Sequence, residues 1–151
     1  MLEDAMAEQN EREVLHHLIE TCKDGERGFR AAAEHVNAPV LKTLFADLAA
    51  QRKQFAEELE PHLYRLGGLP DGGTNAGSLH RGWMLLRGFV PGNHDHAIVV
   101  EAERGEHAAL SAYKDALNGM LPPTVTDLVE TQRDAIEDAN ERIHAVEMGN
   151  E

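Results

Sequence analysis

The fold can be inferred from residues 18–36, whose sequence is LIETCKDGERGFRAAAEHV. Apolar or small residues recur in this stretch at alternating steps of four and three: Leu18, Cys22, Gly25, Phe29, Ala32 and Val36. Steps of this size place all six on one face of an α-helix, and that face can pack against other helices. Asn10 and Glu13 have the spacing of a capping box, so we predict a helix from Asn10 to about Val36.

Apolar seams of the same kind predict three more helices. Asn37 can cap the second helix, which ends at a Gly-Gly pair beginning at Gly67. The third helix begins at Asn93 or Asp95 and ends at Gly119, and a Pro-Pro pair opens the fourth. Because Ala, Leu, Glu and Arg dominate these segments and β-branched runs are rare, we expect an all-α protein.

The connections between the helices indicate how the helices pair. Short connections join the first helix to the second and the third to the fourth, so each pair forms a tight antiparallel hairpin. Residues 67–92 form a long crossover, within which apolar residues recur at helical spacing: Leu79, Trp83, Leu86 and Val90. We therefore predict a four-helix bundle with a helical crossover, in which Trp83 is a packing anchor. Residues 1–151 form a single domain, and residues 1–10 are expected to be flexible.

Composition and charge narrow the functional classes. The chain has 151 residues, 42% of them apolar, which is enough for one domain with a core. Its net charge of −13 argues against nucleic acid and anionic membranes as partners, because both attract positive charge. No apolar stretch approaches the roughly 18–20 residues that span a bilayer. The acidic N-terminus also lacks the pattern of a secretion signal, so a cytoplasmic protein is expected.

Cys22 is the only cysteine, which excludes an internal disulfide and a Cys-rich zinc or iron–sulfur site. Its place in the apolar seam favours a buried thiol over a redox-active one.

The two hairpins resemble each other, which indicates an internal duplication. The Gly-Glu pair at positions 25–26 recurs at positions 105–106, an offset of 80. The Gln-Arg pair at positions 51–52 recurs at positions 132–133, an offset of 81. A glycine inside a helix costs up to about 1 kcal/mol relative to alanine, so these two glycines favour close approach of the first and third helices. The alternative is that they leave room for a ligand.

Three stretches of the sequence are similar to a known family: LIETCKDGERGFR at residues 18–30, LHRGW at residues 79–83 and EAERGE at residues 101–106. Over residues 12–147 the chain resembles the ferritin-like superfamily. It is most similar to an uncharacterised bacterial domain-of-unknown-function family of four-helix-bundle proteins. The resemblance implies a ferritin-like bundle and a cytoplasmic role loosely associated with stress.

The resemblance also implies where metal ligands would lie. Ferritin-like di-iron proteins take one Glu from each of two helices and a Glu-x-x-His motif from each of the other two. Carried over, Glu26 and Glu106 stand at the two lone-Glu positions. The Glu-x-x-His positions of the second and fourth helices read Arg52-x-x-Phe55 and Arg133-x-x-Ile136. Two of the six ligands therefore remain, and arginines replace two carboxylates.

Buried carboxylates need positive charge nearby, and arginine can supply it with two parallel hydrogen bonds. We therefore expect a metal-free bundle with a buried polar cluster of Glu26, Arg52, Glu106 and Arg133. The seam does not distinguish Arg52 from the adjacent Gln51, nor Arg133 from Gln132. If the two glutamines face the core instead, the arginines belong to the solvated face.

No phosphate loop, nucleophile elbow or Ser/His/Asp ordering is detectable, so no catalytic residue is assigned. The leading hypothesis is a non-enzymatic cytoplasmic scaffold or binding protein without a cofactor. The alternative is a di-metal carboxylate protein that binds or oxidises iron or manganese through Glu26, Glu103, Glu106 and His107. A homodimer is the expected assembly, and any other protein partner is left open.

Overall fold

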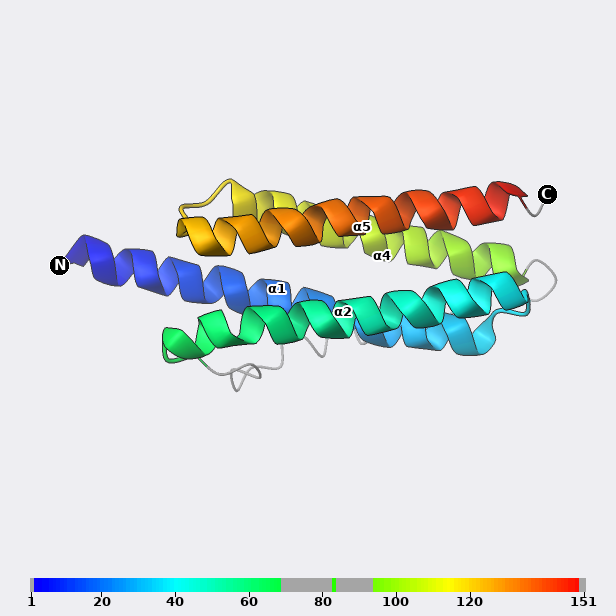
Figure 1. Ribbon diagram of the computed structural model, residues 1–151, viewed down its shortest axis with the longest axis horizontal. Coiled ribbons are helices and arrows are strands. Elements are labelled where there is room, and N and C mark those ends of the chain that lie inside the picture. Colours follow the sequence, from blue (N-terminus) through cyan, green and yellow to red (C-terminus); the bar gives the residue numbers. More distant parts are fainter. Residues whose placement is uncertain (1, 69–82, 84–93, 150–151) are drawn as a thin grey trace.

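The computed structural model describes residues 2–68, Trp83 and residues 94–149, and these contain four long α-helices and no strand. The helices are α1 (Leu2–His35), α2 (Pro39–Arg65), α4 (His94–Leu117) and α5 (Pro123–Gly149). They pack side by side as a four-helix bundle of two hairpins, which confirms the predicted all-α class (Figure 1). The predicted crossover helix lies outside the described residues, apart from Trp83. None of the described helices is long and apolar enough to cross a membrane.

The order of the helices around the bundle requires a long connection. α1 and α5 each contact α2 and α4, so α1 lies diagonal to α5, and α2 lies diagonal to α4. The ring of His94 reaches the carbonyl oxygen of His35, which places the start of α4 where α1 turns into α2. α2 ends at the opposite end of the bundle, so α2 and α4 run in the same direction (Figure 1). The chain between them must bridge about 40 Å, the length of the 27-residue α2.

The start of α2 is capped from a different helix than the sequence indicates. Asn37 does not cap α2, because the N-cap residue is Ala38, which has no capping side chain. The carboxylate of Asp95, in the first turn of α4, instead accepts hydrogen bonds from the backbone N–H groups of Asn37 (2.8 Å) and Ala38 (2.9 Å). Asp95, one of the two residues expected to begin the third helix, lies inside the first turn of α4 and caps α2. Its two carboxylate oxygens tie the first hairpin to the second.

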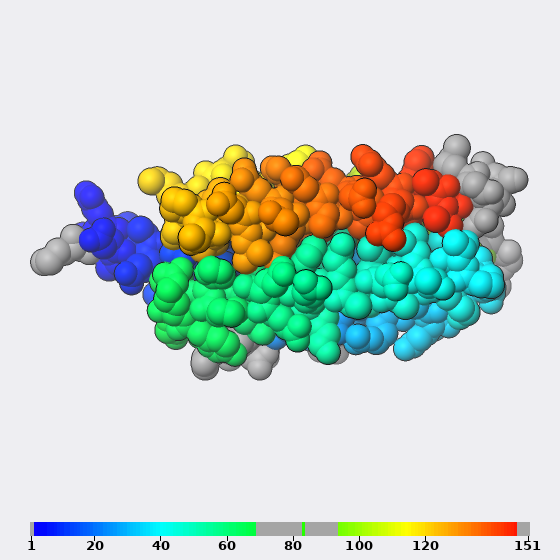
Figure 2. Space-filling model, in the orientation of Figure 1, coloured from blue at the N-terminus to red at the C-terminus, as the bar shows by residue number. Residues whose placement is uncertain are grey.

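The first helix begins earlier than predicted. α1 starts at Leu2, so Asn10 and Glu13 lie inside the helix rather than at its N-terminus. Residues 2–10 are all exposed and project past the other helices (Figures 1 and 2). Residues 2–9 are mostly good helix formers, and the acidic Glu3 and Asp4 favour the positive end of the helix dipole. Local propensity therefore extends α1 beyond the part that tertiary contacts hold.

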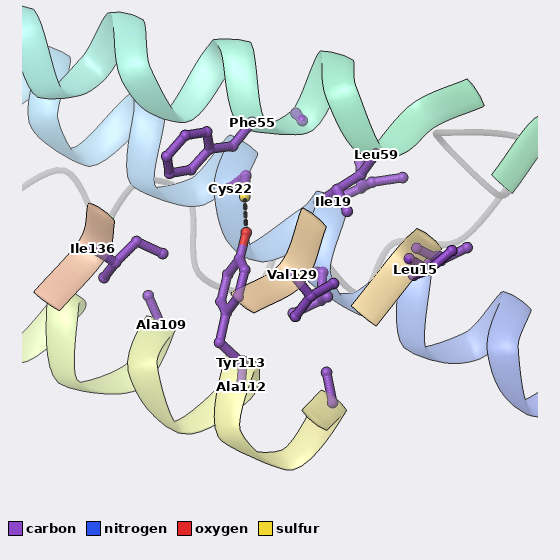
Figure 3. Packing of buried hydrophobic residues seen from close by; sticks show 14 of the residues in the cluster. Leu15, Ile19, Cys22, Phe55, Leu59, Ala109, Ala112, Tyr113, Val129 and Ile136 are labelled. Carbon is purple, nitrogen blue, oxygen red and sulfur yellow. Dashed lines mark hydrogen bonds between the residues drawn. The ribbon is translucent and has the colours of Figure 1, made fainter. Parts of the chain in front are cut away.

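The apolar core forms two clusters along the bundle axis. The first includes Leu15, Ile19, Cys22, Phe55, Leu59, Tyr113, Val129 and Ile136 (Figure 3). The second includes Phe29, Phe45, Leu48, Ile98, Val99 and Ile143. On α2 the position between the two clusters is Arg52, and on α4 it is Glu106. The centre of the bundle is therefore polar, with apolar packing on both sides.

The helix glycines make room for side chains rather than for helix backbones. A Cβ added to Gly25 would lie 3.3 Å from Cγ of Arg52. At both Gly28 of α1 and Gly105 of α4, it would overlap the indole of Trp83. The predicted direct contact between helices at Gly25 and Gly105 is thus replaced by two inserted side chains. Trp83 also packs edge-on against Phe29, with 4.6 Å between the two ring centres, which confirms its predicted role as a packing anchor.

Replacing Gly105 with alanine is expected to displace Trp83, because the new Cβ would overlap the indole Nε1 atom. Overpacking of this kind costs about 1–3 kcal/mol, which should outweigh the higher helix propensity of alanine. Trp83 is the only tryptophan, so its fluorescence emission should shift to longer wavelength. Gly119→Ala is the control, since a Cβ there meets nothing closer than 3.4 Å. Unchanged emission in Gly105→Ala would contradict this packing.

Candidate functional site

A buried ion pair crosses the centre of the bundle. Nη1 of Arg52 on α2 donates to Oε1 of Glu106 on α4 at 2.5 Å, and Nη2 donates to Oε2 at 2.7 Å. The two residues are 1% and 0% exposed. Because α2 and α4 are diagonal in the bundle, this bidentate pair joins two helices that otherwise make little contact.

The surroundings of Arg52 fit a permanently charged guanidinium. Nε donates to the side-chain oxygen of Gln51 at 3.2 Å, and Cζ lies 5.1 Å from the ring centre of Phe29, a cation–π distance. Gly25 leaves the space through which the side chain passes. Burial alone would lower the pKa of Arg52, but the charge and hydrogen bonds of Glu106 outweigh it and raise the pKa above its ordinary value. Arg52 therefore stays charged.

Next to the ion pair, a chain of hydrogen bonds connects all four helices. Cys22 of α1 lies 3.0 Å from the hydroxyl oxygen of Tyr113 on α4 (Figure 3). That hydroxyl donates to the side-chain oxygen of Gln132 on α5 at 2.7 Å, so the thiol of Cys22 must be the donor to Tyr113. The amide nitrogen of Gln132 donates to the backbone oxygen of Phe55 (3.2 Å) and to Glu58 (3.0 Å), both on α2.

Of the four residues predicted to form a buried cluster, the structure brings together Arg52 and Glu106. Glu26 lies near the surface, with its side chain 17% exposed, and pairs with Arg30 one turn later at 2.9 Å. Arg133 is 30% exposed in its side chain and contacts Asp134 at 2.9 Å. The inward orientation expected for Glu26 and Arg133 is therefore wrong. Gln132, only 1% exposed, takes the inward position on α5.

The register of the internal repeat explains why Gln132 rather than Arg133 faces inward. The buried positions of α5 are 125, 129, 132, 136, 139 and 143. Each stands at an offset of 80 from a buried position of α2, namely 45, 49, 52, 56, 59 and 63. At this offset Arg52 corresponds to Gln132 rather than to Arg133, so the offset of 81 expected for α2 and α5 is corrected to 80, which also relates α1 to α4. Applying one offset of 80 to both helices of the hairpin is the sequence signal that could have identified Gln132 as the buried residue.

The candidate metal ligands are dispersed. Glu103 on α4 pairs with His144 of α5 at 3.5 Å, and His107 is exposed. Both oxygens of Glu106 are bound by Arg52, and Glu26 is bound by Arg30. Within the part of the chain that the structure describes, no three His, Cys, Asp or Glu side chains come together in a way that could hold a metal ion. The donor set at the centre therefore does not fit a di-metal site.

Comparison with protein families matches residues 10–119 to a family described as a domain of unknown function, DUF2383. The chain belongs to this family. The matched region contains all of α2 and α4, so both partners of the ion pair lie in the DUF2383 domain. A search of the curated proteins finds no match.

Burial keeps the Cys22 thiol and the Tyr113 hydroxyl of the DUF2383 core protonated at neutral pH. Burial raises the pKa of the Cys22 thiol from 9.0 to about 11, although the hydrogen bond to Tyr113 and the charge of Arg52 oppose the shift. Burial, together with the neighbouring Cys22, raises the pKa of Tyr113 well above 10.0. Neither group is a nucleophile or a base near pH 7.

The raised pKa of Cys22 predicts a loss of stability in alkali. Its contribution is fully present below pH 9, where the thiol is neutral in both states, and is lost as the pH rises through about 11. The shift from 9.0 to about 11 corresponds to a loss of about 2–3 kcal/mol in unfolding free energy. Serine does not titrate in this range, so the stability advantage of wild type over Cys22→Ser should shrink by that amount between pH 8 and pH 11. The unfolding free energies are measured by urea unfolding at each pH. A difference between wild type and Cys22→Ser that stays constant from pH 8 to pH 11 would contradict the assignment.

Proposed function

We propose that this chain is a non-enzymatic, ferritin-like cytoplasmic bundle that acts as a scaffold or binding protein through its outer surface. In this proposal, the Arg52–Glu106 pair holds the central position that a di-iron site occupies in metal-binding members of the ferritin-like superfamily. The observation that carries it is that Arg52 binds both carboxylate oxygens of Glu106 in a fully buried setting.

Electrostatics favour this reading over a metal centre. A cation bound at the centre would need the oxygens of Glu106, and it would have to displace a guanidinium that does not deprotonate. Two positive charges a few ångströms apart in a buried site repel each other by several kcal/mol. Phe55, at the position of α2 where the resemblance places a histidine of a di-iron protein, is a buried apolar side chain of the core.

The topology supports kinship with the ferritin-like superfamily. Two antiparallel hairpins joined by a connection that bridges the whole bundle are typical of ferritin-like proteins. The uniform offset of 80 between the buried faces of the two hairpins is consistent with a duplicated hairpin.

The core offers little to a substrate. Hydrogen bonds join the thiol of Cys22 to the hydroxyl of Tyr113 and that hydroxyl to the amide of Gln132. The charges of Arg52 and Glu106 neutralise each other. A catalytic group must reach a substrate in the protonation state that the reaction needs. These groups are buried and already partnered, so we assign the function to the surface of the bundle.

Metal analysis of protein purified without chelator, from medium supplied with iron and manganese, tests this proposal. We expect far less than one equivalent of either metal per chain, and no difference between the wild type, Glu106→Gln and Glu103→Gln. A di-metal protein would carry about two metal ions per chain. Such a content, lost in Glu106→Gln or Glu103→Gln, would support the alternative site of Glu26, Glu103, Glu106 and His107 and overturn the proposal.

A further inference from the structure

The seam between α2 and α5 contains an open groove near the start of α2 and the end of α5. Its volume is about 610 Å³. Leu44 of α2 and Val146 of α5 are among its apolar lining residues, and Val40, which is 50% exposed, also lines it. α2 and α5 lie side by side on the face shown in Figure 2.

The groove carries one charge of each sign. Asp47 of α2 and Arg142 of α5 both line it, and both are exposed. Neither makes an ion pair or hydrogen bond with any residue in the described ranges. Most other arginines that the structure describes have a carboxylate partner, as Arg52, Arg65 and Arg104 do. The groove therefore carries one exposed charge of each sign beside its apolar lining, and both charges are available to a partner molecule.

The opposite seam of the bundle is closed by the chain itself. α1 and α4, the first helices of the two hairpins, hold Trp83 between Gly28 and Gly105. α2 and α5 are the corresponding second helices, and no described side chain from outside these two helices fills their seam. Among the described residues, Trp83 therefore covers the middle of the α1–α4 seam, whereas the α2–α5 seam is open at this end of the bundle.

We propose that this groove is the interface with a second copy of the chain. A two-fold axis parallel to the α2–α5 seam places α2 of each copy over α5 of the other. Asp47 of one copy then meets Arg142 of the other, and the same contact occurs twice because a two-fold interface is isologous. The exposed Val40 and the partly exposed Val146 become buried between the copies.

The charge pattern selects a second copy as the occupant. A groove with one acidic and one basic rim is complementary to itself under this rotation, so no other partner is required. The proposal does not depend on the central ion pair or on the presence or absence of metal.

Charge reversal tests the proposal, with mass measured by light scattering and sedimentation velocity and with circular dichroism as the check of folding. Wild type should be a dimer of the 16.7 kDa chain. Asp47→Arg and Arg142→Asp should each be monomeric, because each places like charges opposite one another twice. Glu57→Arg reverses an exposed acidic side chain of α2 that does not line the groove, and should remain dimeric.

An equimolar mixture of Asp47→Arg and Arg142→Asp should form a heterodimer, because two arginines of one chain then face two aspartates of the other. The double variant Asp47→Arg/Arg142→Asp should also dimerise. If residues 47 and 142 paired within one chain instead, the double variant would still behave like wild type, but the mixture of single variants would not form a dimer. A monomeric wild type, a dimer that survives both single substitutions, or a mixture that stays monomeric would each overturn the proposal.

Discussion

The bundle depends on the placement of one buried carboxylate. Glu106 is fully buried at the centre of α4, and an unpaired carboxylate there would be very costly. Arg52 meets it from the diagonal helix with two hydrogen bonds, so the charge is neutralised by a group that cannot lose its proton. The neighbouring structure follows from this contact. Gly25 opens a path for the side chain, Phe29 lies against its guanidinium group, and Gln51 binds its remaining nitrogen.

The internal repeat makes the centre asymmetric. The repeat relates Glu106 to Glu26 and Arg52 to Gln132, so a symmetric protein would contain a second central pair. In this chain Glu26 has moved to the surface, and Gln132 joins a neutral hydrogen-bond chain. One half of the centre is therefore ionic and the other neutral. Because a buried ion pair often adds little net stability compared with apolar packing, we interpret the pair as fixing which helices face each other and in what register.

The fold could be predicted from the sequence because helix number and pairing depend on long apolar seams and on glycine and proline breaks. The orientation of single side chains depends on finer information. A short seam does not separate Arg52 from Gln51, and the correct choice of Gln132 required the uniform offset between the hairpins. Contacts between distant segments leave no local signal. The cap that Asp95 provides to α2 and the slot that holds Trp83 both depend on which helix lies next to which.

A double-mutant cycle on Arg52 and Glu106, read from urea unfolding, tests the central claim most directly. Arg52→Met and Glu106→Leu should each lower the unfolding free energy by about 3–5 kcal/mol, since each strands a buried charge. The double variant removes both charges and leaves apolar side chains, so it should be much more stable than the sum of the two losses implies. A coupling energy above about 2 kcal/mol is the predicted result. Losses that add to within about 0.5 kcal/mol would show that the two side chains act independently, which would contradict this account.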